Sequence, residues 1–232
     1  MKTLLIKLSG PMQSWGNEAT FEWRTSHHAP TKSAIIGMIA AALGLRRTDE
    51  RIAKLNELKY AVRVDQPGKM AVDYQIVHYR FKKSINTKVT NREYLQDAVF
   101  VVAVGSEDKA LIETIALALE RPKFALFLGR RAFPLAGVLE TWTRNTDPVN
   151  ALHGLGWQAS NWFMQKQGRF YQAEILADAE LLRDHDWTLT KDQVKSFDPR
   201  SREYEYRAQT HDSVVLSNPL SPETHDLWEQ LG

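Results

Sequence analysis

The chain has 232 residues, no cysteine, and 30 basic against 28 acidic side chains, which gives a formal net charge of +2. A chain of this length can bury about 70% of its unfolded surface, as one large domain or a domain with an appendage, without a disulfide or a structural metal. The lack of cysteine excludes a thiol nucleophile, and no uncharged run approaches the ~20 residues of a membrane-spanning helix. Because the first residues resemble a strand rather than a signal peptide, we expect a cytoplasmic protein without a membrane partner.

The first predicted strand covers residues 2–8 and ends at Ser9-Gly10-Pro11. About twenty residues without a clear pattern follow before Pro30, and connections of this length are usually functional or disordered. Their side chains suit stacking on bases and bonding to base edges: Gln13, Ser14, Trp15, Phe21, Trp23 and Arg24. Packing over the sheet is the alternative for the aromatic rings. Both interpretations stay open for Trp15, and packing is favoured for Phe21 and Trp23.

A buried helix is predicted from Pro30 to Gly44, where a polar opening precedes eleven uncharged residues. Thr31 or Ser33 would cap the first turn, and Gly44 would end the helix in the left-handed conformation. The unpaired N–H groups of that turn, beside Lys32 and the two hydroxyls, indicate a phosphate site. Most such caps bind nothing, so a capped core helix is the favoured alternative.

The next elements alternate between strand and helix. We expect a short helix at 49–58, a strand at 59–65, a projecting hairpin that begins with a strand at 70–81, a buried strand at 98–104, and a helix that Ser106 caps and Pro122 stops. A fourth strand is expected near 124–128 or 133–139. The resulting β-α-β-β-α-β order is the ferredoxin-like arrangement shared by RNA-recognition domains, so the fold class expected is α+β.

Positive charge is concentrated in the hairpin. Residues 74–92 contain five basic side chains and no acidic one, which leaves 25 basic against 28 acidic residues elsewhere. A local basic segment is typical of polyanion binding, although a solvated basic edge that prevents strand pairing would have a similar composition. A second basic feature, Leu128-Gly129-Arg130-Arg131, would let guanidinium groups approach phosphates closely.

The last part of the chain is predicted to contain strands at 170–176 and 201–208 and an amphipathic helix at 221–231. Five tryptophans occur here: Trp142, Trp157, Trp162, Trp187 and Trp228. We interpret them as core or subunit-contact residues rather than base-stacking platforms.

Four stretches occur together in one order: Gly10-Pro-Met-Gln-Ser-Trp-Gly16, Pro30-Thr-Lys-Ser33 with its helix, Arg92-Glu-Tyr-Leu-Gln-Asp97, and Leu128-Gly-Arg-Arg131 with Phe133-Pro-Leu135. In this combination the chain resembles the CasD family, the fifth Cascade subunit of type I-E CRISPR systems. The resemblance extends through residue 140. It implies a ferredoxin-like (RRM-like, RAMP-type) palm at 1–140, an inserted basic β-hairpin thumb at 74–93, and a C-terminal elaboration at 141–232 that packs on the palm.

The resemblance also implies a function. Such a subunit is noncatalytic, grips the 5′ handle of the CRISPR RNA, and joins a CasA-type large subunit to CasC-type backbone subunits; target DNA reaches it through the assembled complex. No cofactor and no metal are expected. The RNA-binding candidates are Gln13, Ser14, Trp15, Arg24, Thr31, Lys32, Ser33, His78, Arg80, Lys82, Lys83, Lys88, Arg92, Arg130 and Arg131.

Two alternatives remain open. In another CRISPR subtype a relative of this family cuts repeat RNA without metal by means of His, Lys and Tyr, and His78, Tyr79 and Lys82 could imitate that set. The motifs resemble the type I-E branch, in which a separate subunit processes the RNA, so binding without catalysis is favoured. A general RNA-recognition module is the other alternative, but its aromatic signature does not occur, and the nearest stretch, 98–104, has no glycine.

Overall fold

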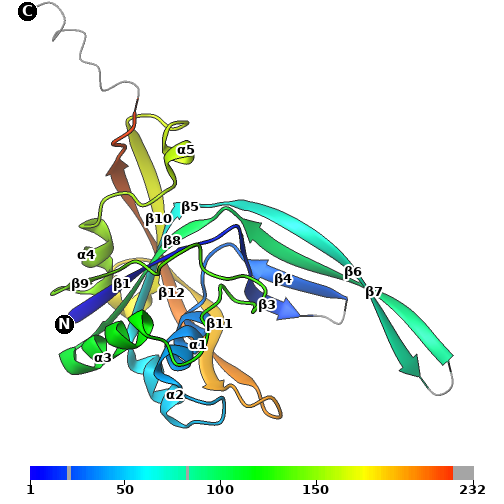
Figure 1. Ribbon diagram of the computed structural model, residues 1–232. Helices are drawn as coiled ribbons and strands as arrows, with labels where there is room; N and C mark the ends of the chain where they lie inside the picture. The colour runs from blue at the N-terminus through cyan, green and yellow to red at the C-terminus, as the bar shows by residue number, and fades with distance from the viewer. Residues whose placement is uncertain (20–21, 82–83, 222–232) are drawn as a thin grey trace, which may run out of the picture.

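The computed structural model describes residues 1–19, 22–81 and 84–221, and it has the expected α+β class with much more strand than helix (Figure 1). The main sheet has seven strands. In spatial order these are β11 (Trp187–Ser196), β12 (Glu203–Ser217), β10 (Phe170–Asp178), β5 (Lys59–Gln66), β8 (Val99–Ser106), β1 (Lys2–Ser9) and β9 (Thr141–Arg144). A second sheet contains β2 (Met12–Gln13), β7 (Ser84–Gln96), β4 (Trp23–His27) and β3 (Trp15–Ala19), with β6 (Lys69–Phe81) paired to β7.

The central strands are apolar on both faces because helices or loops cover both. On β1, Leu4 belongs to the large core cluster that includes α1 (Lys32–Leu43) and α3 (Lys109–Glu120). The next residue, Leu5, belongs to a second cluster with α4 (Pro148–His153) on the opposite face. Strand β8 lies between β5 and β1, antiparallel to both, and its residues are buried from Val99 to Gly105. The buried central strand predicted at 98–104 is therefore confirmed.

The ends of the helices follow local chemistry. The Thr31 hydroxyl accepts a hydrogen bond from the Ala34 backbone at 3.3 Å, and Gly44 ends α1 with φ +76°, so both predicted ends of this helix are confirmed. The predicted cap of α3 is wrong by two residues. Asp108, rather than Ser106, accepts hydrogen bonds from the first free backbone N–H groups of α3, while the Ser106 hydroxyl accepts one from the Asp108 backbone. The predicted short helix at 49–58 is present as α2 (Arg51–Lys54) and a 3₁₀ turn, η1 (Leu55–Glu57).

Two predicted features differ from the structure. The connection between residues 10 and 30 is not a structureless loop, since it contributes β2, β3 and β4 to the second sheet. The fourth strand expected near 124–128 or 133–139 lies in neither range: β9 begins at Thr141 and pairs antiparallel with β1. The segment before β9 lies against the end of α1 instead. There the backbone N–H groups of Lys123 and Phe124 donate hydrogen bonds to carbonyls in the last turn of α1. Its apolar residues thus pack on the helix without joining a sheet.

The C-terminal strands extend the main sheet, because β10 pairs with β5 as well as with β12. Strands predicted at 170–176 and 201–208 are confirmed as parts of β10 and β12, and β11 was not predicted. A short helix, α5 (Asn161–Met164), and a 3₁₀ turn, η2 (Ala179–Leu181), complete this part. Of the tryptophans, Trp157 is buried, Trp142 is half-buried, and Trp162 and Trp187 are exposed. The helix predicted at 221–231 lies outside the described residues beyond Ser221.

Strands β6 and β7 pair from Lys69↔Gln96 to Phe81↔Ser84 and form a long hairpin that projects from the body of the molecule (Figure 1). This confirms the projecting hairpin expected from the sequence. Among the described residues, no helix combines the length and the apolarity that crossing a membrane would need.

Candidate nucleic-acid interface

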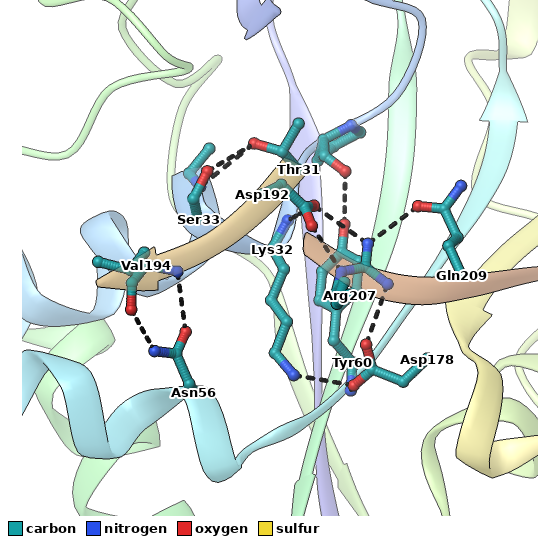
Figure 2. A network of polar contacts seen from close by, with 12 residues as sticks. Thr31, Lys32, Ser33, Asn56, Tyr60, Asp178, Asp192, Val194, Arg207 and Gln209 are labelled. Carbon is teal, nitrogen blue, oxygen red and sulfur yellow. Dashed lines mark hydrogen bonds and ion pairs between the residues drawn. The ribbon is translucent and has the colours of Figure 1, made fainter. Parts of the chain in front are cut away.

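The N-terminus of α1 is closed by a carboxylate rather than open to a phosphate (Figure 2). An oxygen of Asp192, on β11, accepts the Lys32 backbone N–H at 2.8 Å. The Lys32 ammonium is buried and pairs with Asp178 of β10 at 2.9 Å. The protein's own aspartate therefore supplies the negative charge that a helix N-terminus attracts. The phosphate site predicted around Lys32 is wrong, and the capped core helix is the alternative that the structure supports.

Arg207 of β12 completes this network by bonding to both aspartates, at 2.6 Å to Asp192 and 3.0 Å to Asp178. Burial alone would lower the pKa of Arg207, but the two carboxylates outweigh it and raise the pKa. Tyr60 of β5 donates its hydroxyl hydrogen to the Pro30 carbonyl at 2.5 Å, and its pKa is raised by burial. Two cations and two anions thus join α1 to the C-terminal strands.

The residues before α1 are buried as well. Trp15 is 1% exposed and packs edge-on against Phe100, and its indole N–H donates to Gln13 at 3.2 Å. The Gln13 amide donates in turn to the Ala98 carbonyl at 2.7 Å. In this structure Trp15 offers no open face for base stacking and Gln13 no free amide for a base edge, so Trp15 follows the packing interpretation. Trp23 was expected to pack over the sheet, but its side chain is 45% exposed. Phe21 lies outside the described residues.

Two arginines line a hollow of ≈ 460 Å³ where the hairpin joins the body, which we call the arginine cleft, and a third lies near them. Arg92 of β7 and Arg130 line the cleft, and Arg24 of β4 lies beside Arg92 in the strand register. The Arg130 guanidinium lies over the Tyr94 ring, 5.0 Å from its centroid. Burial lowers the pKa of Arg130, and the positive charges of Arg92 and Arg24 lower it further. The Arg130 guanidinium is therefore close enough to Arg92 and Arg24 for their charges to oppose its own.

Arg92, which lines the arginine cleft, has an unsatisfied donor. Nε of Arg92 is the buried side-chain atom that lacks a hydrogen-bond partner within the part of the chain that the structure describes. Asp73 is the carboxylate that lines the cleft, and it already accepts from Gln75 at 2.7 Å and from Tyr94 at 3.4 Å. Buried polar atoms are nearly always paired, so an unpaired cationic donor beside two further guanidinium groups is typical of an anion site.

The basic residues of the hairpin are divided between its two faces, because side chains alternate along a strand. Lys88 and Arg92 share one face with Asp73, and Lys88 pairs with Glu22 at 3.3 Å. His78 and Arg80 are on the other face. Lys82 and Lys83 lie outside the described residues.

The same alternation separates two members of the nuclease set proposed from the sequence. His78 and Tyr79 are consecutive on β6 and point to opposite faces, and the His78 ring contacts the Thr87 hydroxyl at 3.1 Å. One RNA phosphate on either face would therefore meet only one of the two side chains.

A second hollow, of ≈ 560 Å³, extends along α1, and we call it the α1 groove. Four predicted site residues line it: Ser14, Thr31, Ser33 and Arg131. Three further arginines, Arg46, Arg47 and Arg202, also line it and were missed from the sequence. The Arg46-Arg47 pair, which follows Gly44 after one residue, was the available signal. Arg202 precedes β12 and reaches the groove only through the fold.

Comparison with known proteins identifies the family. Residues 3–219 match the family model described as CRISPR-associated protein (Cas_Cas5). The chain belongs to the Cas5 family. This Cas5 chain is 37% identical over 168 residues to the CRISPR system Cascade subunit CasD of Escherichia coli (strain K12). The matched region covers 64% of this chain and 75% of the relative. The family resemblance found in the sequence is confirmed.

Two solved structures are similar over nearly the whole length. The Cas5 chain matches a chain of a CRISPR RNA-guided surveillance complex with a TM-score of 0.76 and 30% identity, covering 98% of this chain and 96% of that one. It matches a crystal structure of a Cas protein with a TM-score of 0.65 and 29% identity, covering 95% and 97%.

The candidate residues of this Cas5 chain thus fall into four places. Arg92 and Arg130, with Arg24 near them, form the arginine cleft; a second set lines the α1 groove; His78, Arg80 and Lys88 lie along the hairpin; Gln13, Trp15 and Lys32 belong to the interior. Within residues 1–19, 22–81 and 84–221, no three His, Asp or Glu side chains are grouped so that they could hold a metal ion.

Proposed function

We propose that this Cas5 chain is a noncatalytic, RNA-binding subunit of a cytoplasmic Cascade-type surveillance complex. In this role it grips the repeat-derived 5′ handle of the guide RNA and joins a CasA-type large subunit to CasC-type backbone subunits. Target DNA reaches it through the assembled complex.

The observation that carries this proposal is the buried, unpaired Nε of Arg92, a residue that lines the arginine cleft. A guanidinium donates through a planar fork that matches the oxygens of a phosphate, and such charge-assisted bonds are about twice as strong as neutral ones. Binding of an RNA phosphate would satisfy Nε and offset the repulsion that Arg130 experiences from Arg92 and Arg24.

The fold supports the same proposal. The strand order β5-β8-β1-β9, antiparallel throughout, corresponds to the order of a ferredoxin-like, RAMP-type palm. In that scheme the palm is extended from residues 1–140 to include β9, residues 74–93 form the thumb, and the chain after β9 forms the elaboration packed on the palm. The match to a chain of an RNA-guided surveillance complex supports a place in such an assembly.

The test is the Arg92→Gln variant, with its affinity for single-stranded RNA that carries the repeat-derived handle measured by fluorescence anisotropy. We expect the affinity to fall about tenfold, since a charged, forked phosphate contact is lost. The melting temperature without RNA should stay the same or rise, because the substitution removes a cation whose buried donor is unpaired.

The matched control is Arg144→Gln, which removes an exposed arginine at the end of β9, away from the cleft. This variant should bind RNA as the unmodified chain does. Unchanged RNA affinity of Arg92→Gln, or a loss that follows only from unfolding, would contradict the proposed role of the cleft.

A further inference from the structure

The α1 groove has an apolar floor between two walls. Its floor includes Ala34, Gly37 and Ala41, the small residues of one side of α1. One wall contains Phe124, whose backbone is bonded to the last turn of α1, and the other contains Phe197 near Gly37. Small residues on the helix leave space that side chains from elsewhere can fill.

The rim of the α1 groove is strongly basic. Arg46, Arg47, Arg131 and Arg202 line it and are exposed, and no aspartate or glutamate lines it. The charge of the rim is therefore unopposed within the described groove, and it is complementary to an acidic occupant.

The interior of the groove offers little to a nucleotide. The Thr31 and Ser33 hydroxyls contact each other at 3.2 Å, and the buried Ser14 hydroxyl contacts Arg130 at 3.3 Å. Phe197 lies edge-on to Tyr204, so these two rings pack on each other instead of forming an open stacking pair. An aliphatic floor with basic edges is better matched by large apolar side chains that carboxylates flank.

We propose that the α1 groove is the docking site for an acidic segment of a neighbouring protein subunit, in which one or two large apolar side chains enter the groove and the flanking carboxylates pair with the arginines of the rim. The inference rests on the proposed function only in requiring that the chain works within a protein assembly. In this proposal the α1 groove binds a protein partner, and the arginine cleft binds RNA.

Gly37 provides a steric test of the groove. A Cβ built there would lie 3.6 Å and 3.7 Å from two atoms of the Phe197 ring, which is ordinary contact, and would meet no backbone outside α1. Gly37→Ala should therefore keep both the fold and the groove, whereas Gly37→Leu should fill the groove. The charge test is Arg46→Glu combined with Arg47→Glu, and its matched control is Lys109→Glu combined with Arg144→Glu, two exposed cations elsewhere.

The experiment assembles each variant with the RNA and the other protein subunits of its complex, and measures incorporation by titration. Gly37→Leu and the Arg46/Arg47 variant should each require about tenfold more chain for half-incorporation, as expected when a buried contact or two rim charges are lost. Gly37→Ala and the Lys109/Arg144 variant should incorporate normally. Handle RNA should bind all four isolated variants with unchanged affinity, which separates this result from failure of the proposed RNA-binding function.

A photoreactive benzoylphenylalanine in place of Phe124, on the wall of the groove, identifies the occupant within the assembled complex. The proposal predicts a crosslink to a protein segment rich in Asp or Glu around an apolar residue. Crosslinking to RNA, crosslinking to residues 222–232 of the same chain, or normal incorporation of Gly37→Leu would each overturn it.

Discussion

Buried arginines in this chain fall into two kinds, according to whether their donors are paired. Arg63 of β5 is fully buried, yet it bonds to both oxygens of Asp65 and to carbonyls of the segment after α4. Burial of a cation is tolerated when every donor is satisfied in this way. Arg92 is less buried and has an unpaired Nε. The first arrangement stabilises the fold, and the second leaves a donor that the proposed RNA phosphate would pair.

At the same scale, Trp15→Ala should lower the free energy of unfolding by about 3–5 kcal/mol, because it leaves a cavity beside Phe100 and removes the partner of Gln13. Urea denaturation measures this loss. RNA affinity per folded molecule should not change. Trp23→Ala, at a position 45% exposed, is the control and should have a much smaller effect on stability. A stable Trp15→Ala variant with weakened RNA binding would restore the stacking interpretation.

Among the elements, the hairpin has two different faces. Val72 and Ile76, on the face of His78 and Arg80, are 56% and 55% exposed, whereas Lys88 and Arg92 occupy the other face. Exposed apolar side chains on a long ribbon are typical of a contact surface for another molecule. The basic composition of residues 74–92 therefore does not describe one continuous cationic surface.

Replacement of Arg80, Lys82, Lys83 and Lys88 with alanine should weaken binding to unrelated single-stranded RNAs by similar factors. The slope of log affinity against log salt concentration should shrink by roughly 0.7 for each residue that neutralises a phosphate. Lys88 should contribute less than a full contact, since it already pairs with Glu22. A salt titration of the quadruple variant measures the slope. Lys109→Ala with Arg144→Ala, which removes two exposed cations outside the hairpin, serves as the control. An unaltered slope in the quadruple variant would mean that the tip is only solvated.

The elements that could be predicted from the sequence are those defined by their own residues. Helix α1 has a cap and a glycine exit, β8 is a continuous apolar run, and the hairpin strands are adjacent in the chain. Strand β11 was not predicted, although its partner β12 is the next strand in the chain. Strand β9 carries no such local signal, and it forms because a distant partner, β1, is available. For the same reason the aspartate at the N-terminus of α1 could not be predicted: Asp192 is 160 residues away from Lys32.

Only part of the candidate site could be predicted, because contacts between residues distant in the sequence leave no local signal. Arg92 and Arg130 could be named as basic residues near phosphate-binding patterns, but nothing local indicates that they share a cleft. The burial of Trp15 and Gln13 depends on Phe100 and Ala98, which come much later in the chain. Residue type indicated nucleic-acid chemistry, and tertiary pairing decided which side chains remain available for it.

For the whole molecule, we predict that the purified chain leaves labelled repeat RNA intact at neutral pH, with or without divalent metal ions. The reason is geometric: His78 and Tyr79 point to opposite faces of β6 and cannot act together on one phosphate. Denaturing gel electrophoresis gives the answer, and His78→Ala should behave like the unmodified chain. Site-specific cleavage that disappears in His78→Ala would instead identify a metal-independent endoribonuclease.

The ion network between α1 and the C-terminal strands has a consequence for the order of events during synthesis. When residues 1–140 have left the ribosome, β5 still has one open edge, and Lys32 still lacks both of its aspartate partners. Exposed strand edges favour pairing with other chains. The edge closes only when β10 pairs with β5. The N-terminus of α1 meets Asp192 only after β11 emerges, and Arg207 pairs with the two aspartates only after β12 emerges. The nascent chain therefore exposes an unpaired edge of β5 until β10 has been made. The ion network is complete only when β12 has been made.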